Sequence, residues 1–132
     1  MAVDFNPVLD VTFEAAEDLS SYQYHFVTLD SAGKAQLMNA ASDVVIGVLQ
    51  NAPKSGEEAT VRVLGISKVV SATSLAVLLP IKPEYNSITD CGKAIAASTD
   101  YTNYAGFVTD LSSAEDDLAS ILLNIGVCNV IA

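Results

Sequence analysis

The chain carries one ordered set of short motifs twice. The set contains an Asp-Gly-Lys turn, a strand-like segment with a glycine, an acidic pair and a second strand-like segment. The paired motifs lie at 30–34 and 90–93, 46–49 and 105–108, 57–58 and 116–117, and 61–64 and 121–124. The offset is 59 or 60 residues each time, and self-similarity at a fixed period is typical of a repeated structural unit. We therefore expect a fold made of two similar halves.

The segments around these motifs have the composition of β-strands. An apolar run that ends at Gln50, a Pro/Gly turn at 51–56 and an alternating run from Ala59 form a hairpin signature. Its second strand is expected to run long and to end at a glycine. Residues 22–29 alternate and predict a strand with one aromatic face. The apolar residues 75–81 predict a further strand, which the neighbouring prolines end.

Helix is favoured only over residues 14–19 and 112–119. Two units of strands and turns give about eight strands, enough to close or nearly close a small barrel and so to limit exposed edges. We therefore predict a mainly all-β fold, a small barrel-like domain built from two similar halves with an extended N-terminal arm.

The arm comprises residues 1–21 and precedes a barrel-like domain at 22–132. It mixes isolated apolar residues with acidic ones, and Asn6-Pro7 interrupts any early helix. A segment with large apolar side chains but no complete pattern of its own packs either on its own domain or on a partner surface that orders it. For contact with a partner surface or another subunit, the candidate residues are Phe5, Leu9, Val11 and Phe13.

Length and charge restrict the partners. A chain of 132 residues has the length of a single domain. Six basic residues against sixteen acidic ones give a net charge of −10, which argues against nucleic acid because phosphate binding depends on Lys and Arg. No apolar run approaches the ~18 residues of a membrane span, and the N-terminus lacks the pattern of a secretory signal. We expect a protein made in a cytoplasm that binds neither nucleic acid nor membrane.

The side chains that usually perform chemistry are few. The single histidine, His25, lies in a predicted strand without a nucleophile motif, and there is no Gly-rich phosphate loop. The acidic pairs favour solvated turns, with an adventitious Ca²⁺ site as the alternative. Cys91 and Cys128 are far apart and cannot form a zinc site with one histidine. We expect them to be reduced, although a disulfide between them stays open. We therefore expect no catalytic residue, no cofactor and no metal.

The only arginine, Arg62, lies between two valines of an alternating strand. Its side chain is therefore expected to face outward, as a surface residue or as an anchor in an interface, where arginine is enriched.

Residues 13–70 carry a recognisable order of motifs: a strand ending in a D-x-x-G-K turn, then IGVLQN, a Pro/Gly turn and a strand with GISKV. This order resembles the capsid decoration (cement) proteins of tailed bacteriophages. The resemblance implies a small β-barrel or β-tulip, often trimeric, that binds the outer surface of the assembled capsid and stabilises it by bridging major capsid protein subunits. The segment SATSLAVLLP at 71–80 and the segment 82–90 depart from that pattern, which bears on the contacts between subunits.

An alternative is a β-barrel module that binds a small molecule or glycan. Such a module would use exposed aromatic side chains, so burial of these rings distinguishes the two interpretations. The aromatic candidates are Tyr22, Tyr24, Phe26, Tyr101, Tyr104 and Phe107.

Overall fold

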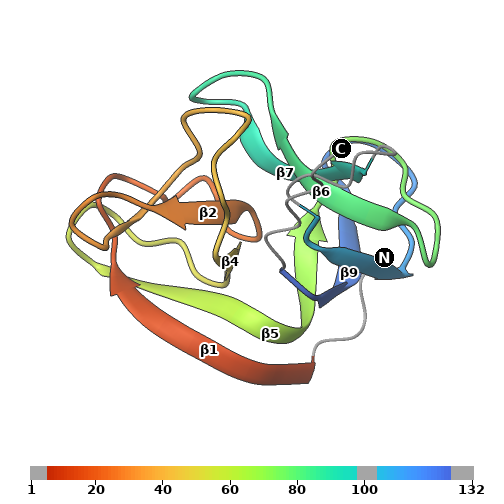
Figure 1. The fold of residues 1–132 in the computed structure, drawn as a ribbon, viewed down its shortest axis with the longest axis horizontal. Coiled ribbons are helices and arrows are strands. Elements are labelled where there is room, and N and C mark those ends of the chain that lie inside the picture. The colour runs from red at the N-terminus through yellow and green to blue at the C-terminus, as the bar shows by residue number, and fades with distance from the viewer. Residues whose placement is uncertain (1–5, 98–103, 126–132) are drawn as a thin grey trace, which may run out of the picture.

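The structure, a computed structural model, describes residues 6–97 and 104–125. Nine strands form one sheet (Figure 1). They are β1 (Asn6–Glu14), β2 (Phe26–Leu29), β3 (Ala35–Gln36), β4 (Gly47–Leu49), β5 (Glu58–Val70), β6 (Pro80–Tyr85), β7 (Cys91–Ala96), β8 (Gly106–Asp110) and β9 (Leu118–Leu123). These described ranges contain no helix, and hence none that could cross a membrane. The helical tendency of 14–19 and 112–119 is overridden, because both segments bond to neighbouring strands instead.

The predicted all-β class is confirmed. The strand order is β3-β2-β4-β5-β9-β8-β6-β7, with β1 also paired to β5, and every strand pair is antiparallel. Among the described strands β3 and β7 do not pair with each other, so the sheet curls into an open half-barrel rather than a closed one.

The two similar halves are confirmed in strand topology. The first half has the order β3-β2-β4-β5 and the second the order β7-β6-β8-β9. The start of β5 pairs with β1 and its end pairs with β9, so β5 closes the first half and opens the second. Figure 1 shows this strand turning as it passes from β1 to β9. The repeat therefore begins earlier than the motifs indicated, because β1 is the counterpart of the second part of β5.

The pairing register is also repeated. Asp10 lies opposite Arg62 as Ile66 lies opposite Leu122, and the pairs from Val11 to Glu14 follow those from Ser67 to Val70 residue by residue. In the first 21 residues, the described part thus contributes a strand to the sheet, and Ala15 and Leu19 are buried in the core. Leu75 is the counterpart of Leu19 in the second half and is also buried. The backbone N–H of Leu19 donates to the carbonyl oxygen of Pro53, and that of Leu75 donates to the carbonyl oxygen of Ser112.

Two predicted strands have different bounds. Residues 22–25 form a turn, and Tyr24 has a φ of 65°, so β2 begins only at Phe26. Leu78, its counterpart in the second half, has a φ of 66°. The strand predicted over 75–81 begins at Pro80 and continues through Pro83, because beyond Ile81 it pairs only with β7, and proline is tolerated on such an edge.

The long strand β5 does not end at a glycine as predicted but passes through Gly65, which has a φ of 103°. Two equivalent glycines, Gly47 and Gly106, allow neighbouring strands to approach closely within each half. A Cβ on Gly47 would lie 2.2 Å from the carbonyl oxygen of Arg62, and one on Gly106 would lie 2.0 Å from that of Leu122. The repeated glycines are therefore required by a close backbone approach in each half.

The buried apolar side chains of both halves form one hydrophobic cluster. It includes Val61 and Leu49 from the first half and Ile121 and Val108 from the second, all completely or almost completely buried. Because one core spans both halves, they form a single packed body.

Candidate interaction surface

The strand β1 carries exposed apolar side chains along one edge of the sheet. Val8 is 74% exposed and Leu9 46% exposed, and Leu9 lies opposite Leu64, which is 47% exposed. We call these three residues the β1 patch. The register shifts on both sides of Leu9, and Pro7 precedes it. Bulges and prolines interrupt an edge for further strand pairing, so side chains rather than backbone groups form the contact surface here.

An ion pair holds β1 against the sheet. The Arg62 side chain is 8% exposed, and its Nε and Nη2 donate to the two carboxylate oxygens of Asp10 at 2.9 and 3.2 Å. Its Nη1 donates to the carbonyl oxygen of Ile66 at 3.2 Å. The expected outward position of Arg62 is therefore wrong: the side chain is buried because a carboxylate from β1 covers it. The arginine thereby fixes the position of β1.

The other predicted contact residues lie in different environments. Leu9 is exposed, whereas Val11 and Phe13 are half-buried and Phe13 packs against the core. Phe5 lies outside the described residues. Sequence inspection missed Val8 and Leu64. Leu64 occupies an outward position of its alternating strand and could have been found, but Val8 is exposed through a shift in register that no local pattern reveals.

A shallow cavity of about 250 Å³ lies beside this ion pair, lined by Tyr24, Gln50, Arg62 and Lys68. The Lys68 ammonium lies 5.9 Å from the centre of the Tyr24 ring, within cation–π range. Gln50 donates from Nε2 to the Ser67 hydroxyl at 2.9 Å. These contacts tie the end of β5 to the first half, so the cavity walls are themselves structural contacts.

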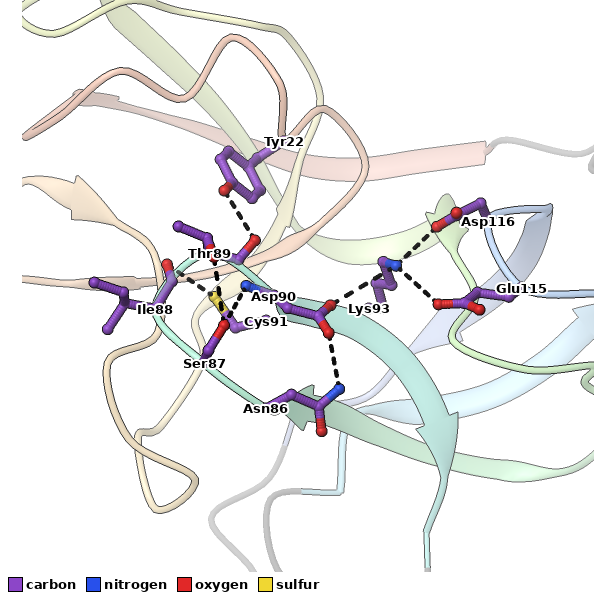
Figure 2. Close-up of polar contacts among 10 residues, drawn as sticks. All are labelled: Tyr22, Asn86, Ser87, Ile88, Thr89, Asp90, Cys91, Lys93, Glu115 and Asp116. Carbon is purple, nitrogen blue, oxygen red and sulfur yellow. Dashed lines mark hydrogen bonds and ion pairs between the residues drawn. The ribbon is translucent and has the colours of Figure 1, made fainter.

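The acidic turns are also structural. Lys93 Nζ lies 2.8 Å from Asp116, 3.4 Å from Glu115 and 3.8 Å from Asp90 (Figure 2). Its hydrogen bond to Asp116 is the main reason that the pKa of Lys93 is raised. In the first half Lys34 pairs with Glu14. Among the described residues no group of three or more His, Cys, Asp and Glu side chains could hold a metal ion.

His25 and Cys91 are buried between the halves. His25 Nδ1 lies 3.1 Å from the Gln23 carbonyl oxygen, its ring meets Tyr22 edge-on, and burial lowers its pKa. Cys91 is a free thiol whose Sγ lies 3.5 Å from the Met38 carbonyl oxygen, and burial raises its pKa. Cys128 lies outside the described residues.

The aromatic candidates do not form an exposed row. Phe26 is fully buried, and Tyr22 and Tyr24 are half-buried against the core. Tyr104 and Phe107 form an edge-to-face pair with ring centres 5.4 Å apart. Tyr101 lies outside the described residues. The arrangement on which the glycan-binding alternative depends is therefore not formed by the described rings.

Comparison with known proteins finds a solved structure with a similar fold. No protein-family model matches the sequence, and no curated protein matches it. Among solved structures, the chain is similar to the N base of head fiber gp8.5 in bacteriophage phi29, with a TM-score of 0.67 and 12% sequence identity. The match covers 88% of this chain and 93% of the head-fiber chain. The two chains thus share an all-β fold over nearly their whole lengths.

Proposed function

We propose that this chain is a structural protein of a bacteriophage virion that binds the outer surface of the assembled capsid. It bridges neighbouring major capsid protein subunits and thereby stabilises the shell. The observation that carries this proposal is the fold shared with the base of a phage head fiber over 88% of the chain. The motif order of residues 13–70, which resembles capsid decoration proteins, points to the same class independently of the fold.

The β1 patch is the contact surface in this proposal. Val8 and Leu9 are exposed on a strand that the Asp10–Arg62 pair fixes in place. An interface centred on three apolar side chains is small, and small interfaces are individually weak. Many copies on one shell compensate, because linked weak contacts add up by avidity. Phe5, a few residues before the patch, belongs to the same proposed contact.

Binding to purified capsids of the phage that encodes the chain tests the proposal. The double variant Val8→Asp/Leu9→Asp places two charges in the patch, and we expect at least a tenfold loss of co-sedimentation with expanded capsids. Val44→Asp is the matched control, because Val44 is a similarly exposed apolar residue, 49% exposed, outside the patch. Point substitutions are preferable to deletion of residues 1–12, which would remove most of β1 from the sheet.

Wild-type occupancy by the double variant would refute the β1 patch as the contact. No co-sedimentation of the wild-type chain with expanded capsids would refute the function itself. The family resemblance also implies a trimer at or near local three-fold positions, and we include this in the proposal. The number of copies bound per capsid tests it.

A further inference from the structure

The two halves carry equivalent rows of residues across the sheet. In the first half the row crosses β1, β5, β4 and β2, and in the second half it crosses β5, β9, β8 and β6. The first, which we call the covered row, is Asp10, Arg62, Val48 and Phe26. The second, which we call the open row, is Ile66, Leu122, Phe107 and Pro80. The two rows are equivalent because their successive members are paired in the same order across equivalent strands.

The two rows differ in burial. In the covered row Val48 and Phe26 are completely buried and Arg62 is 7% exposed, whereas Asp10 at its β1 end is exposed. In the open row Leu122 is 44% exposed and Phe107 39% exposed. All four side chains of the open row are apolar, and the other two, Ile66 and Pro80, are half-buried. The bend beside it adds Val77 and Leu78, which are 51% and 73% exposed.

The second half covers the Phe26 end of the covered row, whereas Asp10 covers Arg62. A Cβ on Gly92, at the start of β7, would lie 2.6 Å from the carbonyl oxygen of Phe26. The Tyr22 hydroxyl donates to the carbonyl oxygen of Thr89 at 3.0 Å, in the turn before β7 (Figure 2). The backbone N–H of Val70 donates to the carbonyl oxygen of Tyr24 at 2.9 Å. The β6–β7 turn and the end of β5 therefore close over the first half.

The first half has its own copy of this covering turn. Gly33 precedes Lys34-Ala35 as Gly92 precedes Lys93-Ala94, and their φ angles are 79° and 84°. Nothing lies within 4 Å of a Cβ built on Gly33, and residues 31–33 are exposed. We call residues 30–33 the head turn. The chain thus has a covering turn with nothing beneath it and an apolar row that is only partly covered, with the Tyr104 ring against Phe107.

We propose that the head turn of a second copy of this chain covers the open row, so that copies associate head to tail. The contact continues the interface that already joins the two halves, and both of its complementary surfaces are present in the chain. Because the two surfaces differ, the contact is heterologous, and each copy can give one contact and receive one. This inference concerns self-association and does not depend on capsid binding.

Light scattering coupled to size-exclusion chromatography of the full chain, without capsids, provides the test. We expect a wild-type mass above the 13.8 kDa of one chain. Ala32→Glu in the head turn and Leu122→Glu in the open row should each weaken self-association at least tenfold, giving the monomer mass. Val44→Asp should keep the wild-type mass. Thermal unfolding of each variant shows that it is folded, and Phe107→Glu provides a second open-row variant.

Mixing the two variants is the decisive measurement. The Ala32→Glu chain keeps an intact open row and the Leu122→Glu chain keeps an intact head turn, so an equimolar mixture should form a dimer. A two-fold symmetric interface would leave the mixture monomeric, because each contact would need both surfaces from both chains. A monomeric mixture, or a wild-type chain that is monomeric at every concentration, would overturn the proposal.

Discussion

The Asp10–Arg62 ion pair occupies a position that the second half fills with Ile66 and Leu122. The double variant Asp10→Ile/Arg62→Leu therefore gives the first half the apolar pair of the second. The two single variants remove one partner each. Because Arg62 is 8% exposed and Asp10 is 31% exposed, the structure predicts unequal costs for the two single changes.

Removing one partner of a fully buried pair costs about 3–5 kcal/mol, because the other charge is left buried without a partner. Asp10→Ile leaves the nearly buried Arg62 with its bond to the Ile66 carbonyl oxygen, so we expect a loss of about 2–3 kcal/mol of unfolding free energy. Arg62→Leu leaves a carboxylate that water can reach, and about 1 kcal/mol is expected. The double variant should lie within about 1 kcal/mol of wild type, since apolar replacement of a buried pair is often neutral.

Urea unfolding at neutral pH, extrapolated linearly to water, gives the free energy of unfolding of the wild type, the two single variants and the double variant. The expected coupling between the two positions is about 3 kcal/mol. Equal costs for the two single variants would show that burial does not set the penalty. Additive costs in the double variant would show that the ion pair does not fix β1 and would refute the reasoning from its geometry.

Three further predictions concern the buried residues Gly47, His25 and Cys91. Gly47→Ala should cost about 3 kcal/mol in urea unfolding, because its Cβ would meet backbone, against about 1 kcal/mol for Gly56→Ala, which has open space at a φ of 83°; equal costs would contradict the packing. Burial lowers the pKa of His25, so the unfolded chain binds more protons below about pH 6.5. Stability should therefore fall as the pH drops from about 6.5 toward the folded pKa, and His25→Gln should flatten that slope. In a Cys128→Ser background, Cys91 should react with a thiol reagent at least about 100-fold faster in urea than in buffer, because burial protects it; similar rates would mean that the thiol is accessible.

Local signals explain why the duplicated architecture could be predicted. The glycines of the two repeats, such as Gly47 and Gly106, are needed for backbone contacts that side chains would block. The turn residues act locally as well: the Asp30 side chain accepts from the backbone N–H groups of Ala32 and Lys34. Residues whose role depends on nearby backbone leave a readable pattern. The order and spacing of such residues were sufficient to indicate two halves.

Contacts between distant segments explain what could not be predicted. Arg62 looked outward-facing because strand alternation is local, but its burial depends on Asp10, 52 residues away. Tyr24 continued an alternating pattern, yet its backbone turns so that its carbonyl oxygen accepts from Val70. Alternation separates the two faces of a strand but does not say whether a second layer covers the outer face. That is why Phe26 and its counterpart Pro80 differ in burial.

The β1 patch and the open row are neighbours on β5, since Leu64 belongs to one and Ile66 to the other. A heterologous contact repeats one rotation between successive copies, so every copy added to an open row would bring a further β1 patch in the same relative orientation. Regularly oriented patches are what a shell of repeated subunits can bind by avidity, because geometry decides whether linked contacts engage together. The two proposals are then coupled: Leu122→Glu lies outside the β1 patch but should still lower capsid occupancy when the chain is dilute. Full occupancy by this variant at low concentration would show that single copies bind independently of one another.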